Sequence, residues 1–177
     1  MNRCFGFFCT MAFVTGLLAA PSQAGDPGDY LTKDGKLKEA LTIQYGAYGL
    51  EPVGGYKGEI CVIEPTGEWT RKAAATKGKL SAKQLAALAQ HLATQDFNEL
   101  PIQLGYEPHA LHDGYFVRIA FGKKATAFNL KKPGDSRTDY LPKPGDPKAT
   151  AWSRFVSLEL VLTDLLQSSE IKRTKEK

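Results

Sequence analysis

The sequence predicts a single α+β domain in which an antiparallel sheet of about five strands carries two helices packed on one face. Three observations lead to this class. Several short segments alternate apolar and polar residues, as half-buried strands do. Two longer segments repeat apolar residues at helical spacing. The segments follow one another as three strands, a helix, two strands and a helix, an order typical of antiparallel hairpins packed against helices.

The N-terminus has the composition of a secretory signal peptide. Arg3 precedes an apolar run over residues 5–20, and a small-x-small ending stops at Ala24. The run is shorter than the roughly 20 apolar residues that span a bilayer. We therefore predict that residues 1–24 are removed, that the protein is secreted or periplasmic, and that no membrane span remains after cleavage.

The rest of the chain divides into three parts. Residues 25–37, rich in Gly, Asp and Lys, are predicted to be a flexible lead-in, residues 38–167 the domain, and residues 168–177 a charged tail. Cys61 is the only cysteine after residue 24, so no internal disulfide can form in the mature chain. The formal net charge of +4 is too small to imply a nucleic-acid partner.

The first three strands are predicted from alternation and turn chemistry. Leu41, Ile43 and Tyr45 alternate with polar residues, which indicates a half-buried strand. The next strand, over residues 56–64, has apolar residues on both faces, as a central strand does. A turn rich in Pro and Gly then precedes a third strand over residues 68–72, which carries Trp69.

The first helix begins with a capping box, in which Ser81 and Gln84 satisfy each other's exposed backbone N–H groups. Its apolar stripe recurs at i, i+3, i+4 and i+7. His91 lies beside this stripe and is expected at the boundary of the core. Phe97 and Leu100 are expected to pack under the same core. The predicted stripe consists of Leu85, Leu88, Ala89 and Leu92.

A second hairpin and a closing helix complete the predicted domain. The hairpin turns at residues 122–124, and the helix begins with Asp146 as N-cap and Pro147 in its first turn. The inward hairpin residues are Tyr115, Val117, Ile119, Phe121, Thr126, Phe128 and Leu130. The predicted helix stripe is Trp152, Phe155, Leu158, Leu162 and Leu165, and Val156, Leu160 and Val161 widen it toward a second buried side or a partner.

No catalytic motif is present in the sequence. It contains no HExxH zinc motif, no glycine-rich nucleotide-binding loop and no serine-hydrolase elbow. Cys61 stands among apolar strand residues, where a buried and inert thiol is expected. We therefore predict a protein that is not an enzyme and has no cofactor.

One loop provides an alternative function. Glu107, His109, His112 and Asp113 are potential metal ligands, so the chain could instead be a small metal-binding protein or a metal-dependent enzyme. Pro108 argues against the regular helix that would bring both imidazoles to one side. The preferred interpretation therefore assigns no metal.

Four lysines, Lys123, Lys124, Lys131 and Lys132, admit two interpretations. They could gather into a patch that binds anionic polymers. Lysine on a strand also protects an exposed sheet edge from pairing with another molecule, and we favour this second interpretation.

Several short motifs resemble a known group of proteins. They are residues 54–58 before a strand, 80–85 opening a helix, 96–101 at the helix exit, the hairpin around 121–123 and the closing helix. Together they resemble uncharacterised bacterial secreted proteins and, more distantly, emfourin-type inhibitors of thermolysin-like metalloproteases. The similarity covers roughly residues 38–166. Segments at 46–53, 65–67 and 131–147 depart from the inhibitor pattern, at places where loops would contact a protease.

These observations predict a secreted, non-catalytic binding module with a protein partner, for which the resemblance suggests a secreted metalloprotease. Binding residues usually lie on loops held by a rigid frame. The predicted binding residues are Gly54, Gly55, Tyr56, Lys57, Tyr106, His109 and His112.

Overall fold

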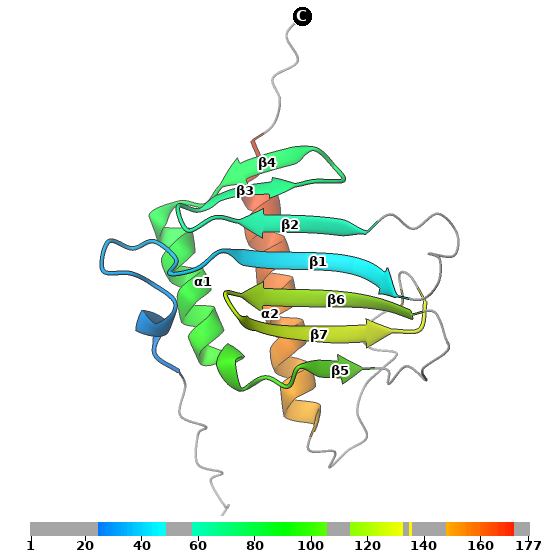
Figure 1. Cartoon of the computed structure of the whole chain (residues 1–177). Coiled ribbons are helices and arrows are strands. Elements are labelled where there is room, and N and C mark those ends of the chain that lie inside the picture. Colours follow the sequence, from blue (N-terminus) through cyan, green and yellow to red (C-terminus); the bar gives the residue numbers. More distant parts are fainter. Residues whose placement is uncertain (1–24, 49–57, 106–113, 133–134, 136–147, 172–177) are drawn as a thin grey trace, which may run out of the picture.

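Seven strands form one mixed sheet, and two helices lie behind it in the view of Figure 1. The computed structural model describes residues 25–48, 58–105, 114–132, 135 and 148–171. The strands are ordered β4-β3-β2-β1-β6-β7-β5 across the sheet. Their bounds are β1 Leu41–Tyr48, β2 Glu59–Ile63, β3 Glu68–Arg71, β4 Thr76–Lys79, β5 Gln103–Gly105, β6 Gly114–Phe121 and β7 Lys124–Leu130. The helices are α1 Ala82–Thr94 and α2 Lys148–Ser168, with short 3-10 turns η1 Pro27–Asp29 and η3 Phe97–Glu99.

The α+β class is confirmed, whereas the prediction of about five strands, all antiparallel, was wrong. The two additional strands are β4 and β5, which form the two edges of the sheet. β5 runs parallel to β7, so the sheet is mixed. Neither strand has an alternating apolar pattern, because β4 reads Thr-Lys-Gly-Lys and β5 contributes one buried side chain, Leu104. Hydrophobic periodicity therefore could not reveal them.

Helix α1 begins as predicted. The Ser81 side chain accepts the backbone N–H of Gln84, and the Gln84 side chain accepts the backbone N–H of Ser81 at 2.9 Å. The predicted stripe of Leu85, Leu88, Ala89 and Leu92 is buried. Phe97 and Leu100 are buried after the helix, as predicted. This exit turns sharply because Asp96 adopts a left-handed conformation with φ of 48°.

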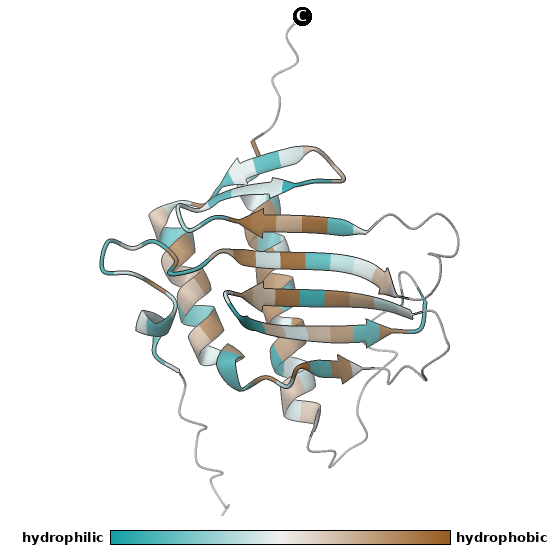
Figure 2. Cartoon of the chain, viewed as in Figure 1, coloured by the Kyte–Doolittle hydropathy of each residue, from teal (hydrophilic) through white to brown (hydrophobic). Residues whose placement is uncertain are grey.

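The central hairpin supplies the middle of the core. All seven predicted inward side chains of β6 and β7 are buried, and Leu41, Ile43, Cys61 and Ile63 continue the same face across β1 and β2. Hydropathy accordingly changes from residue to residue along the strands in Figure 2. The buried Trp69 of β3 extends this core toward the β4 edge.

Helix α2 packs on the sheet through Phe155, Leu158, Leu162 and Leu166. The predicted stripe ended at Leu165, which is half-buried, as is Trp152. The stripe is therefore rotated slightly from the predicted one, because Leu166 rather than Leu165 continues the row after Leu162. Leu160 is 64% exposed, so it does not extend the buried side. The predicted caps of α2, Asp146 and Pro147, lie outside the described residues.

The domain extends beyond both predicted boundaries. Tyr30 and Leu37, within the predicted lead-in, are 2% and 1% exposed, and the Tyr30 ring contacts Phe121 edge-on with centroids 5.4 Å apart. At the other end, Glu170 pairs with Gly78 of β4, and the backbone N–H of Ile171 donates to Lys77. Both segments are mostly polar, so hydrophobic periodicity could not predict these contacts. Each contact depends on one or two side chains or on backbone groups.

Candidate binding surface

The predicted binding residues, Gly54, Gly55, Tyr56, Lys57, Tyr106, His109 and His112, all lie outside the described residues. The same holds for Glu107 and Asp113, so the metal alternative stays a prediction. The strand ends that flank these segments do lie together. Tyr48, the last residue of β1, pairs with Gly114, the first residue of β6. Gly105 ends β5 beside Asn129, near the end of β7. Both predicted binding segments therefore leave the sheet at the same end.

The side chains that alternate with the buried core form a second surface, which we call the open face. In the described part of the chain no helix packs on it, and both helices lie on the opposite side in Figure 1. The register places Gln44 between Ile60 and Arg118, and Thr42 between Val62 and Ala120. The open face comprises Thr42, Gln44, Gly46, Ile60, Val62, Phe116, Arg118 and Ala120.

A shallow hollow lies on this face, where β1, β2 and β6 meet. Gly46 is directly opposite Phe116, and a Cβ atom at position 46 would lie 2.4 Å from Cζ of the Phe116 ring. A Cβ atom at Gly58 would lie 2.9 Å from the carbonyl oxygen of Tyr45. Two glycines therefore let the ring and the backbones approach closely. The hollow has about 240 Å³ and is lined by Gln44, Tyr45, Gly46, Ala47, Gly58, Ile60 and Phe116.

Arg118 gives the open face a positive charge. Its side chain is exposed, and Gln44 and Ala127 stand beside it on the neighbouring strands. No described residue forms a salt bridge or side-chain hydrogen bond with it. An exposed guanidinium on the same face as the half-buried Ile60 and Phe116 combines a charge with apolar surface, an arrangement that suits a carboxylate-bearing partner.

Cys61 and His91 have side chains that often act in catalysis, but here they contribute to packing and to a contact between helices. Cys61 is buried as predicted, and burial raises the pKa of its thiol to about 11, although nearby Arg71 opposes the shift. His91 is half-buried as predicted, with Nε2 3.1 Å from the Ser157 hydroxyl, so it links α1 to α2. Over the described ranges no three His, Cys, Asp or Glu side chains gather as metal ligands.

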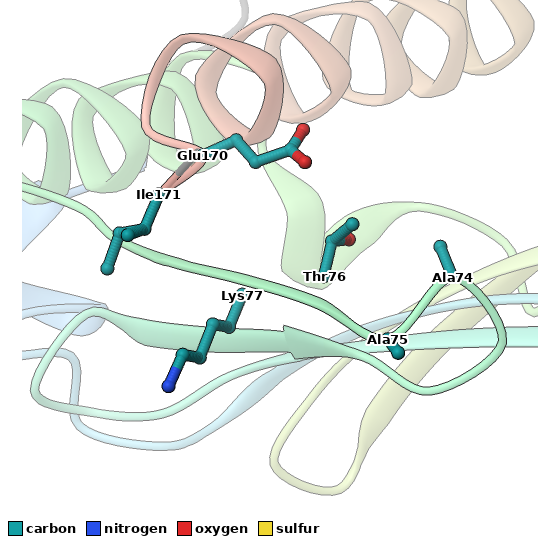
Figure 3. A pocket seen from close by; sticks show the side chains of 6 residues that line it. All are labelled: Ala74, Ala75, Thr76, Lys77, Glu170 and Ile171. Atoms are coloured by element: carbon teal, nitrogen blue, oxygen red, sulfur yellow. The ribbon is translucent and has the colours of Figure 1, made fainter. Parts of the chain in front are cut away.

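A second depression of about 290 Å³ lies between the β3–β4 turn and the residues after α2 (Figure 3). In Figure 3 the side chains of Glu170 and Thr76 point toward the space, and Lys77 points away from it. The Thr76 hydroxyl is buried and has no hydrogen-bond partner among the residues that the structure describes. One exposed carboxylate and one hydroxyl do not make a catalytic or metal-binding set.

The four lysines of the sequence analysis do not form one patch. Lys123 and Lys124 stand at the start of β7, whereas Lys131 and Lys132 follow its end. Residues 125–130 of β7 separate the two pairs by about 20 Å. The edge-protection interpretation was also wrong for Lys124, because β7 is covered by β5 and the Lys124 ammonium donates to the Leu100 carbonyl oxygen at 2.6 Å.

Comparison with known proteins does not assign this chain to a family. No family model and no curated protein matches this chain. The likeness to emfourin-type inhibitors therefore stays a prediction from short motifs. Among the helices that the structure describes, none is both long enough and apolar enough to cross a membrane.

Sequence reasoning did not single out the open face as a site. In the sequence these residues are only the ones that alternate with the inward side chains of the predicted strands. Their combination depends on the register, which sets Gly46 against Phe116 and Gln44 against Arg118. The available signal was Gly46, because a glycine inside a strand often marks a close approach of another group.

Proposed function

We propose that this protein is a secreted, non-catalytic binding module that binds another protein through the open face and the adjoining loops. The observation that carries the proposal is the combination of the hollow at Gly46 and Phe116 with the exposed Arg118 on the same face. Aromatic residues and arginine are enriched in protein interfaces and dominate their binding energy.

The size of the hollow favours a protein partner over a small ligand. Its volume of about 240 Å³ is below the roughly 300–1,000 Å³ of sites that enclose drug-sized molecules. It suits one apolar side chain of a partner, which would pack on Phe116 and Ile60. A carboxylate on the same partner would then bind Arg118. The predicted binding loops leave the sheet beside this surface and would enlarge the contact.

Secretion is supported by the signal-like N-terminus and by the cysteine content. The single cysteine of the mature chain is buried, so an oxidising envelope leaves no exposed thiol in the described domain. The resemblance to emfourin-type inhibitors suggests a thermolysin-like metalloprotease as the partner. In that case the open face and loops would obstruct the protease without being cleaved.

The binding proposal is tested by affinity capture from the secreted proteins of the source organism. The mature chain, residues 25–177, should retain one protein in stoichiometric amount. The Arg118→Glu variant should capture much less of that protein than the wild type. Lys83→Glu is the matched control, because Lys83 is also exposed but lies on α1. Equal capture by all three proteins, or by none, would refute binding through the open face.

The inhibitor version is tested separately. Residual activity of a panel of thermolysin-like metalloproteases is measured against increasing concentrations of the mature chain. Stoichiometric inhibition by the wild type, weakened by Arg118→Glu, is expected. Full protease activity at micromolar protein would remove the inhibitor role and leave the binding role to the capture experiment.

A further inference from the structure

The backbone nitrogen of Gly25 lies 3.0 Å from the carbonyl oxygen of Ala93, to which it donates a hydrogen bond. Ala93 belongs to the last turn of α1. Gly25 is also the first residue after the predicted cleavage point at Ala24. The position that would become the new chain terminus is therefore already held against the C-terminal end of a helix.

Carbonyl groups gather at this helix end and attract positive charge. The last carbonyls of a helix lack intrahelical partners and carry about half a negative charge. Arg154 of α2 donates to two carbonyls just beyond the helix, those of Gln95 and Asp96, and its guanidinium is 3.2 Å from the Asp96 carboxylate. One cation thus already binds at this end, and the Ala93 carbonyl accepts both the backbone N–H of Asp96, at 2.9 Å, and that of Gly25.

We propose that cleavage after Ala24 turns Gly25 into a structural cation, whose α-ammonium binds the C-terminal end of α1. Hydrolysis of the Ala24–Gly25 peptide bond adds water, leaving a carboxylate on Ala24 and an ammonium on Gly25. The nitrogen keeps its hydrogen bond to Ala93 and gains a charge of the sign that the helix end favours. This inference rests on the proposed secretion and is independent of the proposed binding role.

Nearby charges support a cation at this position. The adjacent elements supply Asp26 and Asp29 around η1 and Asp96 and Glu99 around η3, together with Arg154 of α2 and His91 in the last turn of α1. Asp29, Asp96 and Arg154 all act electrostatically on the buried Tyr30, so they belong to this corner of the molecule. Of these six described groups four are acidic and two are basic.

The stabilisation has a defined pH dependence. An α-amino group normally has a pKa of roughly 7.7–8.0, and a favourable site raises this value in the folded state. The added stability is then fully present below the unfolded pKa and disappears as pH rises through the folded pKa. Acetylation of the amine abolishes the charge but keeps an N–H donor for Ala93.

The test compares chains 25–177 with a free amine, with an Nα-acetyl group, and with a Ser-Gly extension. Native chemical ligation at Cys61, the only cysteine after residue 24, supplies all three with identical lysines. The free amine should raise Tm by about 1–4 °C over both other forms at pH 6, and the difference should vanish at pH 10. Its pKa, measured by NMR, should exceed that of the unfolded peptide.

Two results would overturn the proposal, and they are separable. Equal Tm for the free and acetylated forms at pH 6, with an unshifted amine pKa, would show that the charge does not bind the helix end. The intact mass of the protein secreted by its host tests the boundary itself. A mature chain that begins at any other residue would refute the assignment of Gly25, whatever the outcome of the capture experiment.

Discussion

The indole N–H of Trp69 donates a hydrogen bond to the hydroxyl of Ser169, with Nε1 and Oγ 2.9 Å apart. The same hydroxyl donates to the Leu165 carbonyl oxygen at 2.6 Å. This pair joins strand β3 to the residues that follow α2, and the adjacent Glu170 and Ile171 pair with β4. The end of α2 therefore protects the β4 edge of the sheet, in the way that natural proteins cover exposed edge strands.

The first prediction concerns this hydrogen bond. Ser169→Ala leaves the N–H of the buried Trp69 without its partner, which should lower the free energy of unfolding by about 1–3 kcal/mol. Urea denaturation followed by tryptophan fluorescence measures the change. Ser168→Ala is the control, because Ser168 is exposed and its bond from Gln84 is long, at 3.4 Å. Equal effects of the two substitutions would contradict the role of Ser169.

The second prediction concerns the space between β4 and the chain after α2. A Cβ atom at Gly78 would lie 2.2 Å from the Ser169 carbonyl oxygen and 2.5 Å from the Trp69 ring. Gly78→Ala should therefore separate the two segments and cost about 1–3 kcal/mol or more, as other overpacking substitutions do. Hydrogen exchange should show faster exchange of the Ile171 amide.

Thr76→Ala is the matched control on the same strand. Within the described part of the chain the buried Thr76 hydroxyl has no hydrogen-bond partner, so its removal should leave the free energy of unfolding nearly unchanged or slightly higher. An unchanged exchange rate of the Ile171 amide in the Gly78→Ala protein would show that the close approach is not required for the pairing of Ile171 with β4.

The fold could be predicted where side-chain periodicity records burial. Ser81 and Gln84 fixed the start of α1, and the alternation from Tyr115 to Phe121 identified the inward face of β6. Periodicity did not predict β4 and β5, because backbone pairing holds these strands in the sheet. Their sequences contain a single large buried side chain, Leu104.

The candidate surface was less accessible to sequence reasoning, for a different reason. Phe116 and Gly46 are 70 positions apart in the sequence, and no local pattern indicates that they face each other. Their contact follows from the pairing of β1 with β6, which is a long-range choice of register. Tyr30 illustrates the same limit, since one buried ring gives a polar segment no periodicity.

The third prediction concerns the β3–β4 turn. Ala75 adopts φ of 50°, a left-handed conformation that costs an L-residue roughly 1–2 kcal/mol. Ala75→Gly should relieve this cost and, after the added flexibility of the unfolded chain, raise stability by up to about 1 kcal/mol. Ala74→Gly should instead lower it, because Ala74 is not among the described residues with positive φ. Thermal unfolding distinguishes the two, and a less stable Ala75→Gly protein would be the contrary result.

The fourth prediction concerns pH. Burial raises the pKa of the Cys61 thiol to about 11, above the roughly 8.5 of an unfolded cysteine. Its contribution to stability should be complete below pH 8.5 and should fall as pH rises toward 11. The urea midpoint of the wild type should therefore fall relative to that of Cys61→Val over this range. A thiol reagent should label Cys61 at pH 8 only after denaturant is added, and rapid labelling of the native protein would contradict its burial.

The central claim is that the open face binds a protein partner, and site-specific photo-crosslinking tests it most directly. A photoreactive amino acid replaces Arg118 in one protein and Lys83 in another, and each is irradiated with the secreted proteins of the source organism. We expect one predominant crosslinked partner from position 118 and none from position 83. Crosslinks from position 83 alone, or the same diffuse products from both positions, would contradict the assignment of the open face as the binding surface.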